Sequence, residues 1–283
     1  MSEAIKNRYD FVFLFDVKDG NPNGDPDQAN LPRADAEDQR GLVTDVCIKR
    51  KVRNYVMLEK ELKEPYDIFI RQEQVLNRII DSAPGENIRQ RQDSLSEKYF
   101  DIRTFGAVLS TGERGAGTIR GPVQFTFSRS EDRIFQAEHS ITRCAVTTEE
   151  DAKKQESREY ASTFGRKTTV PYALYQMHGF VSAVDAAKTK FSEDDLKLLW
   201  KSLINAFEHD RAAARGEMNP RKLIIFKHDS HLGNELSGRL FERVTVAKKT
   251  DLPRGKDDYA IAVDKSNLPA GIEIKMWPEE TVF

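Results

Sequence analysis

The order in which strand-like and helix-like segments follow one another constrains the fold of this chain more than any single motif. Apolar and β-branched runs bounded by turn residues predict strands, and apolar spacings of three and four predict helices. The strand-like segments are residues 9–17, 99–109, 119–130, 171–186 and 221–228, and the helical ones begin at Thr44 and Ser192. Reduced to a core, the order is strand, helix, two strands, helix, strand. This order predicts an α+β fold with a ferredoxin-like βαββαβ core, in one domain of residues 1–283 with insertions.

The first helical segment concentrates positive charge. Lys49, Arg50, Lys51 and Arg53 place four charges within five positions, and Thr44 is a suitable N-cap for the helix that carries them. Lys49 and Arg53 lie four residues apart on one face, so they need either an anionic partner or good solvation. A solvated face and a phosphate-binding face are about equally compatible with these residues.

Composition indicates a folded chain without a membrane anchor. The 283 residues are 39% hydrophobic and 32% charged, with a formal net charge of −2, and the sixteen Phe residues are too many for a disordered chain of this charge. No segment approaches the roughly 18 consecutive apolar residues of a membrane span, so we expect a cytoplasmic protein. A near-neutral charge excludes a uniformly basic nucleic-acid binder but not a basic groove. Cys47 and Cys144 show no disulfide or zinc spacing.

The loop after the first strand is rich in aspartate. Asp25, Asp27 and Asp35 follow the strand at residues 9–17. Carboxylates of this kind can hold Mg²⁺ for phosphodiester cleavage. Tight turns use the same residues, so an ordered loop is the favoured interpretation, and we predict no metal or other cofactor.

A second polar segment, residues 143–168, is poor in core residues, which indicates an insertion. Four blocks, three before this segment and one after it, occur in a characteristic order: GLVTDVCIKRKVRNY, YFDIRTFGAVL, IRGPVQFTFSRS and FEHDRAAARGEM. In these blocks the chain resembles, over nearly its whole length, the CRISPR backbone subunits of type I-C Cascade, which belong to the Cas7 family. The resemblance implies a modified RNA-recognition core shaped like a palm. It also implies a finger-type insertion at residues 63–98 and a thumb hairpin at residues 143–168.

The resemblance implies RNA contacts in the palm. The basic helix of the family matches Thr44 to Arg53, which implies that Lys49, Arg50 and Arg53 contact phosphates. The glycine-containing palm segment of the family matches residues 101–108, which implies that Arg103 and Gly106 lie near the RNA. Contacts to phosphates rather than to bases would suit a protein that accepts any guide sequence.

The resemblance also implies a thumb that folds over the guide and displaces one nucleotide at regular intervals. Such a thumb needs an apolar wedge between bases, for which Val146 and Phe164 are the candidates. It also needs basic residues around the kink, for which the candidates are Arg143, Arg166 and Lys167.

The implied function is binding of guide RNA (crRNA) without catalysis. The implied partners are crRNA, further copies of the chain, target DNA through the guide, and the large, small and repeat-processing cap subunits of Cascade, with no membrane. Backbone subunits of related type III complexes cleave target RNA with a metal and an acidic loop residue. Asp25, Asp27 and Asp35 therefore keep a metal-dependent target-RNA endonuclease as the alternative.

Overall fold

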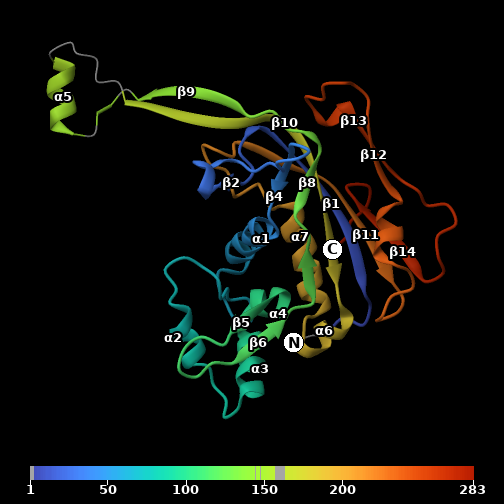
Figure 1. Cartoon of the computed structure of the whole chain (residues 1–283). Coiled ribbons are helices and arrows are strands. Elements are labelled where there is room, and N and C mark those ends of the chain that lie inside the picture. The colour runs from blue at the N-terminus through green and yellow to red at the C-terminus, as the bar shows by residue number, and fades with distance from the viewer. Residues whose placement is uncertain (1–2, 144, 147, 157–162) are drawn as a thin grey trace.

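The computed structural model describes residues 3–143, 145–146, 148–156 and 163–283, without the side chains of residues 143, 151, 154–156, 163 and 164. Its main element is an antiparallel sheet with the strand order β14-β11-β1-β10-β8-β4, in which β7 and β9 also pair with β10 (Figure 1). The strands are β1 (Tyr9–Gly20), β4 (Arg40–Val43), β7 (Val123–Phe125), β8 (Ser128–Arg133), β9 (Ala137–Arg143), β10 (Thr163–Val181), β11 (Glu217–His228) and β14 (Ile272–Trp277). The mixed α+β class predicted from the sequence is confirmed.

Two helices cover one face of this sheet. Alternate residues of β1, Phe11, Phe13 and Phe15, are buried in one apolar cluster with residues of α1 (Asp45–Lys60) and α7 (Glu193–Ile204). On α1 the buried apolar positions Ile48, Val52 and Val56 recur every four residues, which is the spacing of one helix face. The helices are therefore held by the sheet.

The opposite face of the sheet carries a second apolar cluster. The intervening β1 residues Val12 and Leu14 pack there with Ile224 and Phe226 of β11. This cluster also includes residues of α8 (Ser237–Phe241) and of the hairpin formed by β12 (Val244–Lys248) and β13 (Tyr259–Val263). The sheet is thus the middle layer of three.

A smaller unit with its own apolar cluster lies beside this core. It contains α2 (Leu76–Asp81), α3 (Ile88–Lys98), α4 (Phe100–Phe105) and the hairpin of β5 (Gly106–Leu109) and β6 (Gly117–Arg120). Phe69, Leu95, Tyr99 and Ile102 are buried in its centre. The predicted insertion at residues 63–98 contributes α2 and α3, and the unit continues beyond it to β6.

A long hairpin projects from the sheet. β9 pairs with the first part of β10, from Thr163 opposite Arg143 to Thr169 opposite Ala137, and α5 (Glu149–Glu156) stands at its tip. We call residues 137–169 the arm. In Figure 1 the arm extends to the left, above α1 and α2. The described residues of the segment predicted as a thumb, residues 143–168, contribute α5 and most of the β10 strand of this arm.

The remaining short elements lie in loops. They are the strands β2 (Gly24–Asp25) and β3 (Leu31–Pro32), the 3-10 turns Pro26–Gln28 and Lys256–Asp258, and α6 (Ala183–Thr189). No helix in the described ranges has the length and hydrophobicity needed to cross a membrane.

Of two local predictions, one is confirmed and one is wrong. The helix start predicted at Ser192 is confirmed, and a capping box stabilises it: the Ser192 side chain accepts from the backbone of Asp195 and the Asp195 side chain accepts from that of Ser192. The extended conformation predicted for residues 99–109 is wrong over Phe100–Phe105, which is helical. There the Asp101 carboxylate accepts hydrogen bonds from the backbone of Phe69 at 2.7 Å and Ile70 at 3.0 Å, which fixes the turn from a distant segment.

Candidate nucleic-acid interface

Thr44 joins the start of α1 to the loop after β1. Its Oγ1 accepts a hydrogen bond from the backbone of Cys47 at 3.3 Å, which confirms the predicted N-cap. The same hydroxyl and the Thr44 backbone N–H both donate to Asn23 Oδ1 at 3.0 Å. One side chain therefore fixes both the helix start and the loop that faces it.

We expect Thr44→Ala to lower the free energy of unfolding by about 1–2 kcal/mol, because the N-cap bond and a bond to Asn23 are both lost. Urea denaturation measures this change. Thr44→Ser keeps the hydroxyl and should stay close to the wild type. Equal stability of the alanine and serine variants would contradict this role.

The four clustered positive charges of α1, at residues 49–53, have anionic or polar partners within the protein. Lys49 pairs with Asp45 at 2.9 Å, and its ammonium lies over the Phe105 ring at 5.6 Å from the centroid. The Arg50 guanidinium donates to the carbonyl of Ile70 at 3.0 Å. These partners explain how charges so close in sequence are accommodated on one helix.

Two of these charges are buried. Lys51 pairs with Asp210, and its side chain is 3% exposed. Arg53 pairs with Asp101 at 2.7 Å, and its side chain is 11% exposed. A phosphate could reach Arg53 only after that pair opened, which would leave Asp101 buried without its partner. The structure therefore places Arg53 in the interior, and we remove it from the proposed RNA contacts. The side chain of Lys49 is 13% exposed, but its partner Asp45 is 23% exposed and keeps contact with solvent if that pair opens, so Lys49 remains. Arg50 is half-buried and remains as well.

Arg103 lies still deeper. Its side chain is 1% exposed and forms two hydrogen bonds to Asp195, at 2.8 and 2.9 Å. Its remaining N–H groups donate to the carbonyls of Pro65, Ser96 and Glu97. All five donors of a guanidinium have acceptors in this arrangement. The expectation that Arg103 contacts RNA does not fit this burial, and its role here is to join the small unit to α7.

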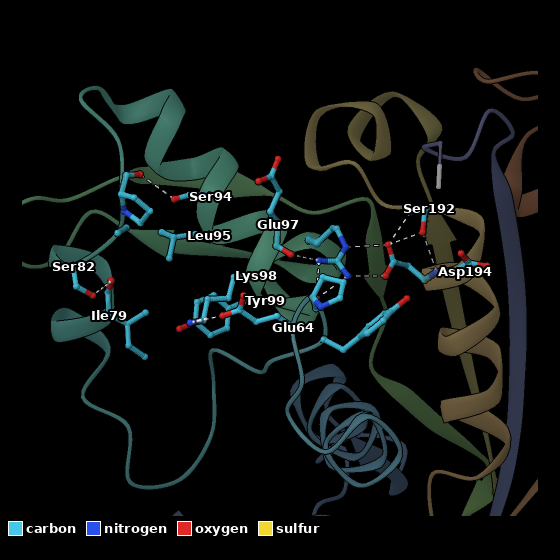
Figure 2. Close-up of a pocket in the computed structure, with 16 residues that line it drawn as sticks. Glu64, Ile79, Ser82, Ser94, Leu95, Glu97, Lys98, Tyr99, Ser192 and Asp194 are labelled. Carbon is cyan, nitrogen blue, oxygen red and sulfur yellow. Dashed lines mark hydrogen bonds and ion pairs between the residues drawn. The ribbon is translucent and has the colours of Figure 1, made fainter. Parts of the chain in front are cut away.

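Arg103 and Asp195 form part of the wall of a cavity of about 800 Å³ between the small unit and the start of α7 (Figure 2). Glu64, Glu97 and Ser192 line it as well. The exposed rim residues Glu64 and Lys98 pair with each other at 2.9 Å. With more carboxylates than cations in its lining, this cavity is not suited to a phosphate.

The backbone conformation at position 106 explains why this residue is glycine. It follows α4 with φ 78°, and a Cβ there would lie 2.2 Å from the Ile119 carbonyl oxygen and 2.5 Å from the Gly121 nitrogen. Only glycine combines this conformation with that contact at low cost. The residue is needed for the turn into β5, and a role of Gly106 in RNA binding stays a prediction.

Two of the basic residues predicted for the thumb lie at the base of the arm. Arg166 is 81% exposed on its side chain, and its Nε lies 3.2 Å from Glu138 across the hairpin. Lys167 donates to the carbonyl of Ala213. Both project charge at the point where the arm leaves the sheet.

Hydrogen bonds connect this base to the start of α1. Next to the Ala213 carbonyl that binds Lys167, the Ala214 carbonyl accepts from the backbone of Asn21 at 2.6 Å. Asn21 belongs to the loop in which Asn23 holds Thr44. We call this connected surface, made by the loops at residues 20–25 and 210–216 with Thr44 and Lys167, the arm–helix junction.

The outer thumb candidates are Arg143, Val146 and Phe164. Val146 is half-buried, but the side chains of Arg143 and Phe164 lie outside the described part of the structure. The assignment of Val146 or Phe164 as the wedge stays a prediction.

The aspartates of the first loop have separate partners. Asp25 accepts from the backbone of Asp27 at 3.1 Å and pairs with Arg33 at 3.4 Å, while Asp27 is exposed. Asp35 accepts from the backbone of Glu37 and from Arg129, and both bonds hold the pKa of its carboxyl below the usual range. Among the described residues, no three His, Cys, Asp or Glu side chains are grouped to hold a metal ion.

Comparison with known proteins gives one family and several structural relatives. Residues 7–264 match the family described as CRISPR-associated protein Cas7. The chain is 24% identical over 230 residues to a CRISPR-associated protein Cas7 of Haloferax volcanii, in a match that covers 70% of this chain and 65% of that protein. The chain thus spans less than two thirds of that relative.

Solved structures show a similar fold. A chain of a CRISPR RNA-guided surveillance complex, in a pre-nicking state, superposes with a TM-score of 0.50 at 11% identity, covering 77% of this chain and 78% of that one. A chain of another CRISPR RNA-guided surveillance complex gives a TM-score of 0.45 at 13% identity, covering 77% of this chain and 68% of that one. Because the family match extends over most of its length, the chain belongs to the family of CRISPR-associated protein Cas7.

Proposed function

We propose that this chain is a guide-RNA-binding backbone subunit of a CRISPR effector complex, of the type I-C Cascade kind. It binds crRNA, assembles with further copies along the spacer, and presents the guide for pairing with target DNA in the cytoplasm. The large, small and repeat-processing cap subunits complete the complex. The observation that carries this proposal is the arm–helix junction, which connects a basic helix to a projecting hairpin in a chain of the Cas7 family.

The proposed RNA path runs over the junction. Lys49 and Arg50 lie on α1, whose N-cap Thr44 belongs to the junction, and Arg166 and Lys167 lie at the base of the arm. The loops between them are tied by backbone hydrogen bonds, so the two sets of charges keep a fixed spacing. Fixed contacts to a sugar–phosphate backbone bind any sequence, while base pairing supplies the specificity.

The inferred core of this palm is ferredoxin-like. The strands β1, β8, β10 and β11, taken as the first to fourth of the motif, are arranged as β11-β1-β10-β8, all antiparallel. The helices α1 and α7 follow the first and third of these strands and contact the same apolar cluster. This arrangement supports the βαββαβ assignment.

The proposed role is structural rather than catalytic. Asp25 and Asp35 each pair with an arginine, Arg33 and Arg129, which leaves their carboxylates engaged within the loop. We expect target RNA to stay intact when it is incubated with guide-loaded protein and Mg²⁺. Cleavage that Asp25→Ala, Asp27→Ala or Asp35→Ala abolishes would instead support a nuclease of the type III kind.

Binding assays with unrelated guides test the proposal. Two crRNAs with the same repeat and different spacers should bind the purified chain with affinities within a few-fold of each other, because phosphate contacts carry no sequence information. Fluorescence anisotropy at 50 mM and 200 mM salt measures both affinity and salt dependence. A strong preference for one spacer would contradict backbone recognition.

A further inference from the structure

A short segment around β8 alternates aromatic and charged residues on one face. In residues 127–135, FSRSEDRIF, every second side chain from Phe127 to Phe135 is Phe, Arg, Glu, Arg and Phe. Between them, Ser128 and Ser130 are buried on the covered face. Asp132 instead lines the same cavity as its neighbours Glu131 and Arg133, at a shift in the β4–β8 register. Phe127 is 51% exposed and Phe135 is 68% exposed. Two large rings are therefore held at the surface on either side of two arginines.

These side chains line two adjoining cavities. One, of about 420 Å³, is lined by Phe127 and Arg129, and the other, of about 530 Å³, by Arg133 and Phe135. Arg40 and Glu131 line both, so the cavities form one continuous surface. We call it the β8 face.

The β8 face lies on the side of the sheet opposite α1. Its β10 residues Gln176 and His178 alternate with Tyr175 and Met177, which point into the cluster that contains α1 and α7. His178 stacks on Phe241 of α8, with ring centroids 4.0 Å apart, on the other side. The surface is thus separated from the arm–helix junction by the thickness of the sheet.

The polar groups of this face suit the edges of nucleobases. Gln176 Nε2 lies 3.0 Å from His178 Nε2, and burial lowers the pKa of His178, so the imidazole is neutral at pH 7. A neutral imidazole and an amide both offer a donor and an acceptor, as base edges do. Arg129 is oriented by Asp35 at 2.8 Å, and Arg133 has no ion pair within the described residues.

We propose that the β8 face is a second binding surface for single-stranded nucleic acid, on which unpaired bases stack on Phe127 and Phe135 and the intervening arginines contact the backbone. Aromatic rings interleaved with arginines bind single strands in this way without sequence preference. The two cavities are lined by nearly equal numbers of basic and acidic side chains: Arg40, Arg129, Arg133, Lys248 and Arg254, with Asp38, Glu131, Asp132 and Asp251. Stacking therefore contributes more than charge, and binding here depends less on salt than guide binding at the junction. This goes beyond the proposed function, because it concerns a different strand and a different surface.

The test uses the full chain saturated with guide RNA, so that the junction is occupied. Labelled oligothymidylate and oligouridylate are titrated and followed by fluorescence anisotropy. We expect a bound complex whose affinity falls roughly fivefold to a hundredfold in Phe127→Ala and in Phe135→Ala, because each ring stacks on about one base. Phe127→Trp should retain binding. The oligomer that binds more tightly identifies DNA or RNA as the strand.

Phe283→Ala is the matched control, since Phe283 is 43% exposed and lines a different cavity. Unchanged oligonucleotide affinity in both β8-face variants would overturn the proposal, as would an equal loss in Phe283→Ala. Failure of both oligomers to bind the wild-type chain would overturn it too. Loss of self-assembly in the variants would then identify this surface as a protein interface. A wild-type chain that does not bind guide RNA contradicts the proposed function instead, and the oligonucleotide titration can then be made on the unloaded chain.

Discussion

Replacing Arg103 by alanine is expected to lower the free energy of unfolding by about 3–5 kcal/mol. The substitution leaves the buried Asp195 carboxylate without its cation and leaves the carbonyls of Pro65 and Ser96 without their donor. An unpaired buried charge is among the most destabilising changes that a single substitution can make. Urea denaturation followed by circular dichroism measures the loss.

Arg120→Ala is the control for this prediction. Arg120 also pairs with an aspartate, Asp185 at 3.4 Å, but its side chain is 80% exposed. Exposed pairs contribute between zero and about 1 kcal/mol, so this variant should stay near wild-type stability. If Arg103→Ala were as stable as Arg120→Ala and had lost guide affinity, Arg103 would be an RNA contact and its assignment as a buried connection would be wrong.

Removing the four proposed phosphate contacts together is expected to make guide binding less dependent on salt. The slope of the logarithm of the binding constant against the logarithm of salt concentration should become shallower by roughly 3. The estimate follows from about 0.7 counterions released per contact on a single strand. The substituted residues are Lys49, Arg50, Arg166 and Lys167, each changed to alanine. Affinities for two guides of unrelated sequence, measured over a series of salt concentrations, give the slope, and both guides should lose affinity equally.

A charge-matched variant controls for net charge. Four lysines away from the junction are changed to alanine: Lys6, Lys197, Lys227 and Lys275, three of which line a cavity beside α7, β11 and β14. This variant loses the same charge, and its slope should stay within about 1 of the wild-type value. Equal slopes for the two quadruple variants would show that the junction is not the RNA path.

Features that depend on neighbouring residues could be predicted from the sequence. The N-cap at Thr44 and the helix start at Ser192 depend on residues within four positions of one another, and both occur as predicted. The first strand was recognised from its own aromatic run. The helix at Phe100–Phe105 was missed because its aromatic composition favours a strand, while the contacts that fix it come from Phe69 and Ile70.

The candidate site could be predicted only in part, because its ion pairs also join residues that are far apart in the sequence. The carboxylate partners of Arg53, Lys51 and Arg103 lie 48, 159 and 92 residues away in sequence. The cluster of positive charge was therefore compatible with a phosphate-binding face, although half of it pairs with Asp101 and Asp210 within the protein. The signal that could have indicated this was Asp101, a carboxylate in the largely apolar segment YFDIRTF, because a buried carboxylate needs a cationic partner.

The RNA content of the chain purified from cells that express a repeat–spacer array tests the central claim most directly. The absorbance ratio at 260 and 280 nm, followed by sequencing of the extracted RNA, gives both amount and identity. We predict that RNA of guide length copurifies, with spacers represented in proportion to their expression. Purified chain that carries no RNA, and that binds no crRNA at 50 mM salt, would contradict the account.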